Sequence, residues 1–341
     1  MAYISFKPSD FFNTVLYTGT GGTQSITGVG FQPDWVWLKD RSLTYDHQLH
    51  DSSRSASAGY LASNNTNAEN STYPLSSFDS DGWTTVSGGT PGQNASSDSF
   101  VSWNWLANGG TTSSNTDGSI TSTVQVNSTS KFSIGTFTSD GGTSTIGHGL
   151  GVTPDFYMIK TRSISNGWYV YTTAIDGSLD FLSLETTAAK SDSGLSSPSS
   201  TVFSVNSSVQ GANGTTCVFY AFKSIKGYSK FGTYTGNGSS NGTYVYTGFR
   251  PAFVLTKRTN AVGSWVVQDN KRPSYNQGGN YVYASSTNVE ATDLPIDILS
   301  NGFKQRQGTY ADTNGSGSTY LYIAFAEFPL VGSNGIPGTA R

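Results

Sequence analysis

The sequence predicts an all-β protein built from three tandem β-sandwich domains. Aromatic and β-branched residues alternate with polar residues, as in Thr243–Thr247, and this period of two indicates strands with one buried face. Clusters of Gly, Ser, Asn and Asp separate the short runs, and no window has apolar residues at helical spacing. Short strands punctuated in this way favour a sandwich or a jelly roll.

One pattern occurs three times along the chain. Each copy opens on a glycine turn, continues with a proline that leads an apolar strand ending in lysine, and closes on an aromatic strand. The proline-led strands run from Pro33 to Lys39, from Pro154 to Lys160 and from Pro251 to Lys257, and the closing strands cover residues 100–105, 217–222 and 320–325. Copies of this length predict separate domains of one type and not a stacked solenoid.

The repeat sets the expected domain boundaries. We expect repeat one over residues 1–109, a Gly/Ser/Thr/Asn linker over 110–130, repeat two over 131–226, repeat three over 227–330 and a C-terminal tail over 331–341. The linker is expected because the stretch Asn108–Gly118 has no large apolar residue. The join between repeats two and three is short, so we expect these two to pack together and repeat one to be held more loosely. The repeats are called units one, two and three below.

Composition excludes several functions. Charged residues make up 12% of the chain and the net charge is −3, so there is no electrostatic footprint for nucleic acid. The single cysteine, Cys217, is expected to be a buried thiol. The first residues lack the pattern of a secretory signal, and no run reaches transmembrane length. We therefore expect no membrane insertion.

The histidines are the first candidates for acid–base or metal chemistry. They are His47, His50 and His148. In a strand, His47 and His50 point to opposite faces, and units two and three carry Trp168 and Trp265 at the place of this cluster. The histidines are therefore interpreted as features of single units and not as a metal or catalytic site.

The carboxylates do not form a recurring pair. Asp34 and Asp155 follow the leading proline, but unit three has Ala252 there. Glutamates recur in the units at Glu69, Glu185 and Glu290. A glycosidase needs two carboxylates that face one bond, and the chain has no nucleophile elbow, phosphate-binding loop or Cys/His metal spacing. We expect no enzyme, no catalytic residue, no cofactor and no metal.

Other charged residues are interpreted as structural. Asp51 and Arg54 recur as Asp269 and Arg272, and each Asp-x-x-Arg is expected to form a local ion pair, with an arginine site for a ligand as the alternative. Unit two lacks this pair. The proline-led strands end in Lys39/Arg41, Lys160/Arg162 and Lys257/Arg258. These cations are expected to be solvated strand ends that discourage edge pairing.

Aromatic rings are the remaining candidates for ligand contact. Tryptophan and tyrosine rings can stack on sugar faces while neighbouring polar groups supply hydrogen bonds. The candidates for glycan contact are Trp83, Trp168, Tyr171 and Trp265. By contrast, Trp35, Trp37, Trp103 and Trp105 lie in pairs two apart and are expected in the core.

The repeated pattern resembles a known group of proteins. The segments that carry the resemblance best are Thr247–Pro251 and Tyr322–Glu327, and the pattern extends from about Phe12 to Pro329. It is similar to tandem lectin-like β-domains in virion proteins, of tail, fibre or decoration type, of marine tailed bacteriophages such as cyanophages. The resemblance implies a lectin-like form of the sandwich and a structural or receptor-contacting role.

These observations lead to one functional hypothesis and two alternatives. The expected protein is a non-enzymatic virion protein, associated with the tail or fibre, that contacts host surface glycans. The alternatives are a capsid decoration or tail-scaffold protein with no ligand and, more remotely, a polysaccharide depolymerase. The expected partners are other virion proteins and host cell-surface polysaccharide, and a homotrimer is expected only by analogy with phage fibres. The expected location is the virion, assembled in the host cytoplasm.

Overall fold

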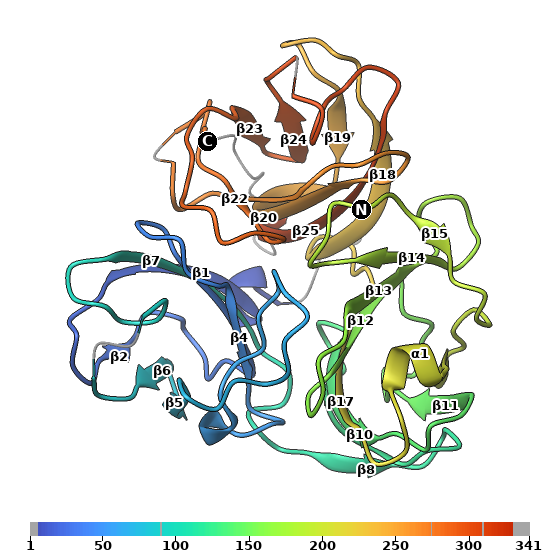
Figure 1. Ribbon diagram of the computed structural model, residues 1–341. Helices are drawn as coiled ribbons and strands as arrows, with labels where there is room; N and C mark the ends of the chain where they lie inside the picture. Colours follow the sequence, from blue (N-terminus) through green and yellow to red (C-terminus); the bar gives the residue numbers. More distant parts are fainter. Residues whose placement is uncertain (1–5, 89–90, 274, 309, 330–341) are drawn as a thin grey trace.

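The computed structural model describes residues 6–88, 91–273, 275–308 and 310–329, and the expected tail over 331–341 lies outside this part. The fold is all-β, and its strand pairs are antiparallel. Figure 1 shows three lobes around a common centre, one for each unit.

Unit one contains two sheets. Its strands are β1 (Phe12–Thr18), β2 (Ser25–Ile26), β3 (Trp35–Asp40), β4 (Gln48–Asp51), β5 (Leu75–Asp79), β6 (Gly82–Thr85) and β7 (Ser99–Trp105). They form a large sheet in the order β1-β7-β3-β4 and a small one in the order β2-β6-β5. Two 3-10 turns, η1 (Pro8–Asp10) and η2 (Ala56–Ala58), accompany them.

Unit two repeats this strand order and adds strands at both edges. Its strands are β8 (Ser113–Asn115), β9 (Ser122–Asn127), β10 (Phe132–Thr138), β11 (Ser144–Gly147), β12 (Phe156–Thr161), β13 (Trp168–Thr172), β14 (Asp180–Ser183), β15 (Ser191–Asp192), β16 (Val202–Val205) and β17 (Thr216–Phe222). The large sheet has the order β15-β14-β13-β12-β17-β10-β9-β8, and β11 pairs with β16. A single helical turn, α1 (Ser207–Gln210), precedes β17.

Unit three has the same core order. Its strands are β18 (Ser229–Thr235), β19 (Tyr244–Tyr246), β20 (Phe249–Arg258), β21 (Trp265–Asp269), β22 (Val282–Tyr283), β23 (Ile296–Leu299), β24 (Gly302–Gln305) and β25 (Thr319–Pro329). The sheets have the orders β18-β25-β20-β21-β22 and β19-β24-β23. In every unit, therefore, the closing strand lies between an earlier strand (β1, β10 or β18) and the proline-led strand, and the proline-led strand pairs with the strand that follows it.

The expected linker over 110–130 is wrong. Strands β8 and β9 lie in this segment, and β9 pairs with β10 from Ser122–Phe137 to Asn127–Phe132. Val124 is buried in the core of unit two, and Val126 packs against the same core. The two valines are two residues apart, which places both on one face of a strand. This alternation is the signal that the Gly- and Ser-rich composition concealed.

Each lobe has an outer core between its large and small sheets. In unit one, Trp83 of the small sheet packs with Val36 and Leu38 of β3. Corresponding clusters lie between β11–β16 and the large sheet of unit two, and between β19–β24–β23 and the large sheet of unit three. The two faces of each large sheet are thus both covered, which explains why β3 and β12 are buried along their whole length.

The inner faces of the three large sheets form one shared core. Equivalent residues of the three units meet there: Trp35, Phe156 and Phe253 from the proline-led strands, and Trp105, Phe222 and Phe325 from the closing strands. The rings of Trp105 and Phe253 lie 5.7 Å apart and those of Phe222 and Phe325 lie 5.6 Å apart. A small cavity of about 20 Å³ remains between them, lined by aromatic and aliphatic side chains.

This core corrects the expectation that unit one is held loosely. Trp35 of unit one stacks on Tyr220 of unit two at 4.7 Å, and Phe12 stacks on Phe325 of unit three at 5.3 Å. Because unit one supplies four buried tryptophans to the shared core, it is bound to both neighbours. The four, expected in the core, are indeed buried.

Candidate functional site

The three junctions between units contain the lysines that end the proline-led strands. Lys39, Lys160 and Lys257 are completely buried, so the expectation that they are solvated is wrong. Each Nζ donates to at least one backbone oxygen of its own unit and to one of a neighbouring unit. The bonds between units are Lys39 to Thr287 O (3.1 Å), Lys160 to Thr66 O (3.0 Å) and Lys257 to Thr187 O (3.1 Å). The three bonds form a closed cycle around the molecule.

Burial changes the acidity of these lysines. It lowers the pKa of each ammonium group to about 8, because a charge loses hydration when it enters the protein. The sequence alone could not predict the burial of these lysines, because in each case a loop of a neighbouring unit helps to cover the ammonium group.

Tryptophan indoles and one imidazole add a second bond at each junction. Trp168 Nε1 donates to Ala62 O at 2.7 Å, and Trp265 Nε1 donates to Ser183 O at 2.8 Å. His47 Nε2 lies 2.9 Å from Tyr283 O and donates to it, because Nδ1 accepts the indole N–H of Trp37. His47 thus replaces the indole of the other two units.

The proposed glycan-contacting aromatics are therefore wrong. Trp83, Trp168 and Trp265 have no exposed surface, and Tyr171 is 2% exposed. Trp83 fills the outer core of unit one and Tyr171 that of unit two. Trp168 and Trp265 lie at junctions, where each indole binds a neighbouring carbonyl. No face of these rings is open to a sugar.

Two of the junctions hold a buried ionic network built on the Asp-x-x-Arg segments. Arg54 Nε lies 2.5 Å from Asp51 Oδ2, and the same guanidinium contacts Glu69. Unit two completes this one–two junction, with Tyr220 Oη donating to Asp51 at 2.6 Å and Arg162 pairing with Glu69 at 2.8 Å. Its two carboxylates and two guanidinium groups together carry no net charge.

The three–one junction repeats this network. Arg272 Nε lies 2.7 Å from Asp269 Oδ2, and its Nη1 lies 3.3 Å from Glu290. From unit one, Trp103 Nε1 donates to Asp269 at 3.0 Å and Arg41 pairs with Glu290 at 2.8 Å. Both Asp–Arg pairs therefore tie a loop and also meet a neighbouring unit.

The two–three junction has no such network among the described residues. The positions of Asp51, Arg54 and Tyr220 are taken by Thr172, Ile175 and Ile323. Lys190 takes the place of Glu69, because Lys190 N donates to Thr259 O at 2.9 Å as Glu69 N donates to Arg162 O at 2.8 Å. The interpretation of Glu185 as the counterpart of Glu69 is thus corrected.

The remaining histidines and the cysteine are buried apart from one another. Burial and the nearby Arg54 lower the pKa of His50 to about 3. His148 accepts from Leu150 N at 3.2 Å and lies 3.3 Å from Ser199 O. Burial raises the pKa of the Cys217 thiol to about 12, which keeps it protonated and unreactive.

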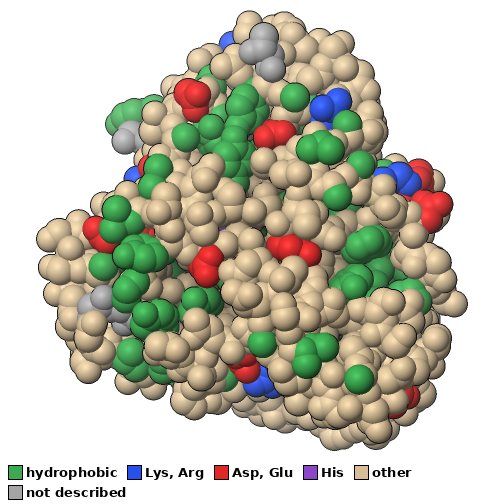
Figure 2. Space-filling model, in the orientation of Figure 1, with side chains coloured by type: hydrophobic (Ala, Val, Ile, Leu, Met, Phe, Trp, Pro, Cys, Tyr) green, Lys and Arg blue, Asp and Glu red, His purple; other side chains and the backbone are tan. Residues whose placement is uncertain are grey.

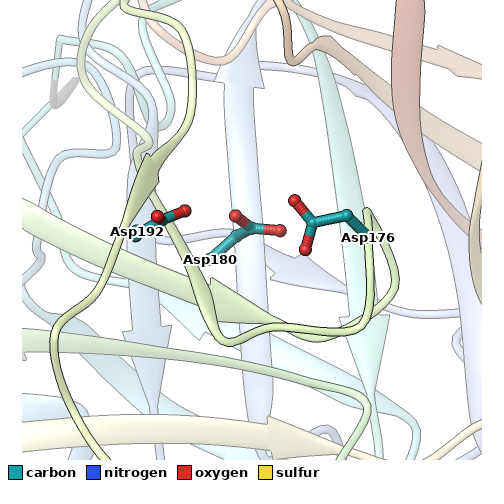
Figure 3. Close-up of side chains that lie close together, drawn as sticks. All are labelled: Asp176, Asp180 and Asp192. Atoms are coloured by element: carbon teal, nitrogen blue, oxygen red, sulfur yellow. The ribbon is translucent and has the colours of Figure 1, made fainter.

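Among the described residues, one group of three potential metal ligands lies close together. Asp176, Asp180 and Asp192 point their carboxylates toward one another near the start of β14 (Figure 3). Lys190 Nζ lies 2.5 Å from Asp176, 2.5 Å from Asp180 and 3.5 Å from Asp192. The ammonium group of the chain's own lysine thus contacts all three carboxylates and offsets part of their charge.

A polar depression lies in the loop between β4 and β5. We call it the unit-one hollow. It measures about 340 Å³, and its lining residues are Asp46, Tyr60, Ala62, Asn65, Asn67, Ala68, Glu69, Asn70, Ser71 and Thr72. This volume is at the lower end of the range of small-molecule sites, about 300–1,000 Å³.

Hydrogen bonds hold the walls of the unit-one hollow in place. Asp46 accepts from Asn65 Nδ2 at 3.2 Å, and Tyr60 Oη accepts from Asn70 Nδ2 at 3.2 Å. Burial and the nearby Asp46 raise the pKa of Tyr60 to about 12, so its hydroxyl stays protonated. The side-chain amide of Asn67 is exposed and has no partner among the described residues. Amides, a carboxylate and a hydroxyl can together bind the hydroxyl groups of a ligand.

Sequence reasoning missed the unit-one hollow. The available signal was the run Asn64–Asn67 shortly after Tyr60, which concentrates amide groups in a single loop.

The exposed surface is dominated by polar uncharged groups. Figure 2 shows few charged side chains on the face of Figure 1, with hydrophobic patches over the lobes. Leu43, Ile164 and Val262 are 44%, 39% and 67% exposed, and they lie in corresponding loops that follow the buried lysines. No helix among the described residues is long and apolar enough to cross a membrane.

Comparison with known proteins identifies one family. The chain belongs to a family described as a domain of unknown function, DUF7483, whose model matches residues 7–329. That match covers all three units. No curated protein and no solved structure matches the chain.

Proposed function

We propose that the chain is a non-enzymatic structural protein of a phage virion, associated with the tail or fibre, that contacts host surface glycans. In this proposal the three pairs of sheets are tandem copies of one lectin-like β-sandwich of jelly-roll type. The protein is assembled in the host cytoplasm, and its partners are other virion proteins and host polysaccharide. It requires no nucleic acid and no membrane insertion.

The observation that carries the glycan contact is the unit-one hollow. Its free Asn67 amide, the Asp46 carboxylate and the Tyr60 hydroxyl provide both donors and acceptors for sugar hydroxyls. A surface with few charges also favours neutral polar ligands over charged ones.

Hydrolysis is disfavoured by the state of the carboxylates. The hollow offers Asp46 and Glu69, but both oxygens of Glu69 are bound by the guanidinium groups of Arg54 and Arg162. A glycosidase needs two carboxylates that face one bond, and Glu69 is already engaged by both guanidinium groups. The depolymerase alternative therefore has no free pair of carboxylates in this hollow.

The scaffold alternative is favoured by a different observation. Leu43, Ile164 and Val262 expose apolar surface in corresponding loops of the three units. A virion component with threefold symmetry could contact all three at once. Because one chain already arranges three units around a centre, the trimer expected by analogy is not required to form such a surface.

The test is binding of the purified protein to an array of host envelope polysaccharides. The proposal predicts binding that falls at least several-fold in Asn67→Ala and is unchanged in Asn288→Ala, which alters the corresponding loop of unit three. Absence of binding to all host polysaccharides would refute the glycan contact. Electron microscopy of labelled virions would separate a tail position from a head position.

A further inference from the structure

The small sheet of unit three presents a distinctive outer face. Figure 1 shows β19, β24 and β23 on the side of their lobe away from the common centre. Tyr244, Lys304 and Asp297 lie side by side across these strands, because Lys304 pairs in register with both of the others. Val245 and Phe303, the next pair, are buried in the outer core. Since side chains alternate along a strand, the row that contains Tyr244 faces away from this core.

The other two units have neither a ring nor a charge at these places. The pair that corresponds to Tyr244 and Lys304 is Ser25 and Thr84 in unit one, and Thr145 and Ser204 in unit two. In unit one the two hydroxyl groups lie 2.8 Å apart and bind one another. The sheet therefore forms without an aromatic ring or a lysine on its outer face, which points to a role of these two side chains in unit three alone.

The ring of Tyr244 is held in place and open to solvent. The residue is 43% exposed, and its hydroxyl donates to Asn301 Oδ1 at 2.6 Å. The ring edge lies against Gly302, where an added Cβ would come within 3.1 Å of it. By contrast, Lys230 Nζ lies 5.3 Å from the centre of the neighbouring Tyr246 ring. No cation and no second ring lies over Tyr244 among the described residues.

Two cations converge beside this open ring. Lys304 Nζ donates to Asn241 Oδ1 at 2.6 Å, and Arg306 Nη1 donates to the same oxygen at 3.4 Å. Within the part of the chain that the structure describes, the carboxylate paired with either cation is that of Asp297, at 3.4 Å from Arg306 Nε. The group thus keeps a net positive charge. An anion placed between the two cations offsets the repulsion of these like charges.

An open aromatic ring beside a net positive charge matches a sugar that carries an anion. The apolar face of a sugar ring can stack on a tyrosine ring. Ammonium and guanidinium groups form strong hydrogen bonds with carboxylates, because both partners are charged. The Cβ atoms of directly opposed residues lie about 4.5–5.5 Å apart. A carboxylate on a sugar that stacks on Tyr244 is therefore within reach of Lys304.

We propose that this outer face, formed by Tyr244, Lys304 and Arg306, binds an acidic polysaccharide through a uronic acid residue. The sugar ring lies on Tyr244, and the sugar carboxylate accepts hydrogen bonds from Lys304 and Arg306. Although the surface as a whole has few charges, this face concentrates two cations around one ring. The inference rests on the proposed glycan contact and adds to the unit-one hollow a second site for a different class of sugar.

The test is saturation-transfer NMR on the full chain with three separate probes. Trigalacturonate has both the sugar ring and the charge, its trimethyl ester has the ring alone, and acetate has the charge alone. We expect trigalacturonate to bind with a Kd on the order of 1 mM and both other probes to bind at least tenfold more weakly. Because salt screens exposed charges, raising the ionic strength from about 0.05 M to about 0.5 M should weaken the binding several-fold.

Variants that copy unit one locate the site. Lys304→Thr and Tyr244→Ser should each weaken trigalacturonate binding at least fivefold, whereas Lys304→Arg and Tyr244→Trp keep the charge and the ring and should retain it. Lys271→Thr is the matched control, because it removes the same charge from another exposed lysine of unit three, and it should leave binding unchanged. Thermal melting establishes that each variant is folded.

Three results would overturn the inference. They are no binding of trigalacturonate at about 10 mM, binding of the ester or of acetate as tight as that of trigalacturonate, or unchanged binding in Lys304→Thr. Asn67→Ala alters the unit-one hollow and should leave trigalacturonate binding unchanged. If trigalacturonate does not bind but the array still shows binding that depends on Asn67, the inference is wrong and the proposed function stands. If trigalacturonate binds through Lys304 but no host polysaccharide binds, the reverse holds.

Discussion

The one–two and two–three junctions solve the same packing problem with different chemistry. At the first, Asp51, Arg54 and Tyr220 form a buried network of charges and hydrogen bonds. At the second, the corresponding residues are Thr172, Ile175 and Ile323, and Ile175 packs against the shared apolar core. All members of the network have changed together.

This difference indicates that the members of the network depend on one another. A buried ion pair contributes little when compared with well-packed apolar residues of similar volume, but removing one partner is costly because the other stays buried and unpaired. The shared core and the lysine bonds are common to all three junctions, so they hold the units together. The ionic network adds a local arrangement that two junctions use and the third does without.

The largest loss of stability is expected when one partner of the buried ion pair is removed and the other is kept. Arg54→Ile should destabilise the protein by about 3–5 kcal/mol, because it leaves the Asp51 carboxylate buried without its cation. Denaturant unfolding measures this change. A loss below about 1 kcal/mol would mean that Asp51 is not held by Arg54 as the structure indicates.

The buried lysines predict a rise in stability with pH. Their pKa of about 8 in the folded protein lies below the value near 10.4 of an unfolded chain. Between these values the unfolded state binds more protons, so the free energy of unfolding increases with pH, by at most about 1.4 kcal/mol per pH unit for each lysine. Ionisation of Cys217 in the unfolded state opposes this with one proton.

Unfolding at pH 7.5, 8.5 and 9.5 checks this slope. These values stay below the range in which unfolded tyrosines ionise, near pH 10. Lys160→Met should reduce the slope by roughly one third to one half, since one of the three lysines no longer titrates while the opposing ionisation of Cys217 remains. A free energy of unfolding that does not change with pH, or that changes equally in the variant and the unaltered protein, would contradict the burial of these lysines.

Copying the two–three junction should repair the broken network. Adding Asp51→Thr and Tyr220→Phe to Arg54→Ile removes the unpaired carboxylate and its hydroxyl donor while keeping the ring of Tyr220. We expect the triple variant to recover at least half of the stability lost in Arg54→Ile. If the losses of stability caused by the three changes are instead additive, the members of the network act independently.

The smallest effect is expected at the rim of the same network. Arg162 pairs with Glu69, but its side chain is 21% exposed, and such pairs contribute about 0.2–1 kcal/mol. Arg162→Ala should therefore cost far less than Arg54→Ile in the same unfolding experiment. Arg41→Ala at the three–one junction is the matched control and should behave alike.

The sequence was sufficient for the residues whose environment is set within one unit. The alternating pattern predicted the all-β class, and the spacing of Trp35 and Trp37 predicted burial. It failed where a neighbouring unit decides the environment. Trp168, Trp265 and Lys257 look like surface residues in the sequence, yet each is covered by a loop about 70 to 110 residues away along the chain.

The unit-one hollow lay beyond sequence reasoning for a related reason. It depends on how Tyr60 and Asp46 approach the Asn-rich loop. Such a site arises from differences between copies, which a repeat alignment marks but cannot place in space.

Calorimetric unfolding of the full chain tests most directly whether the three units form one body. The shared core and the cycle of lysine bonds predict one transition, with equal calorimetric and van't Hoff enthalpies. Two or three resolved transitions, or an early transition in which unit one unfolds alone, would contradict it.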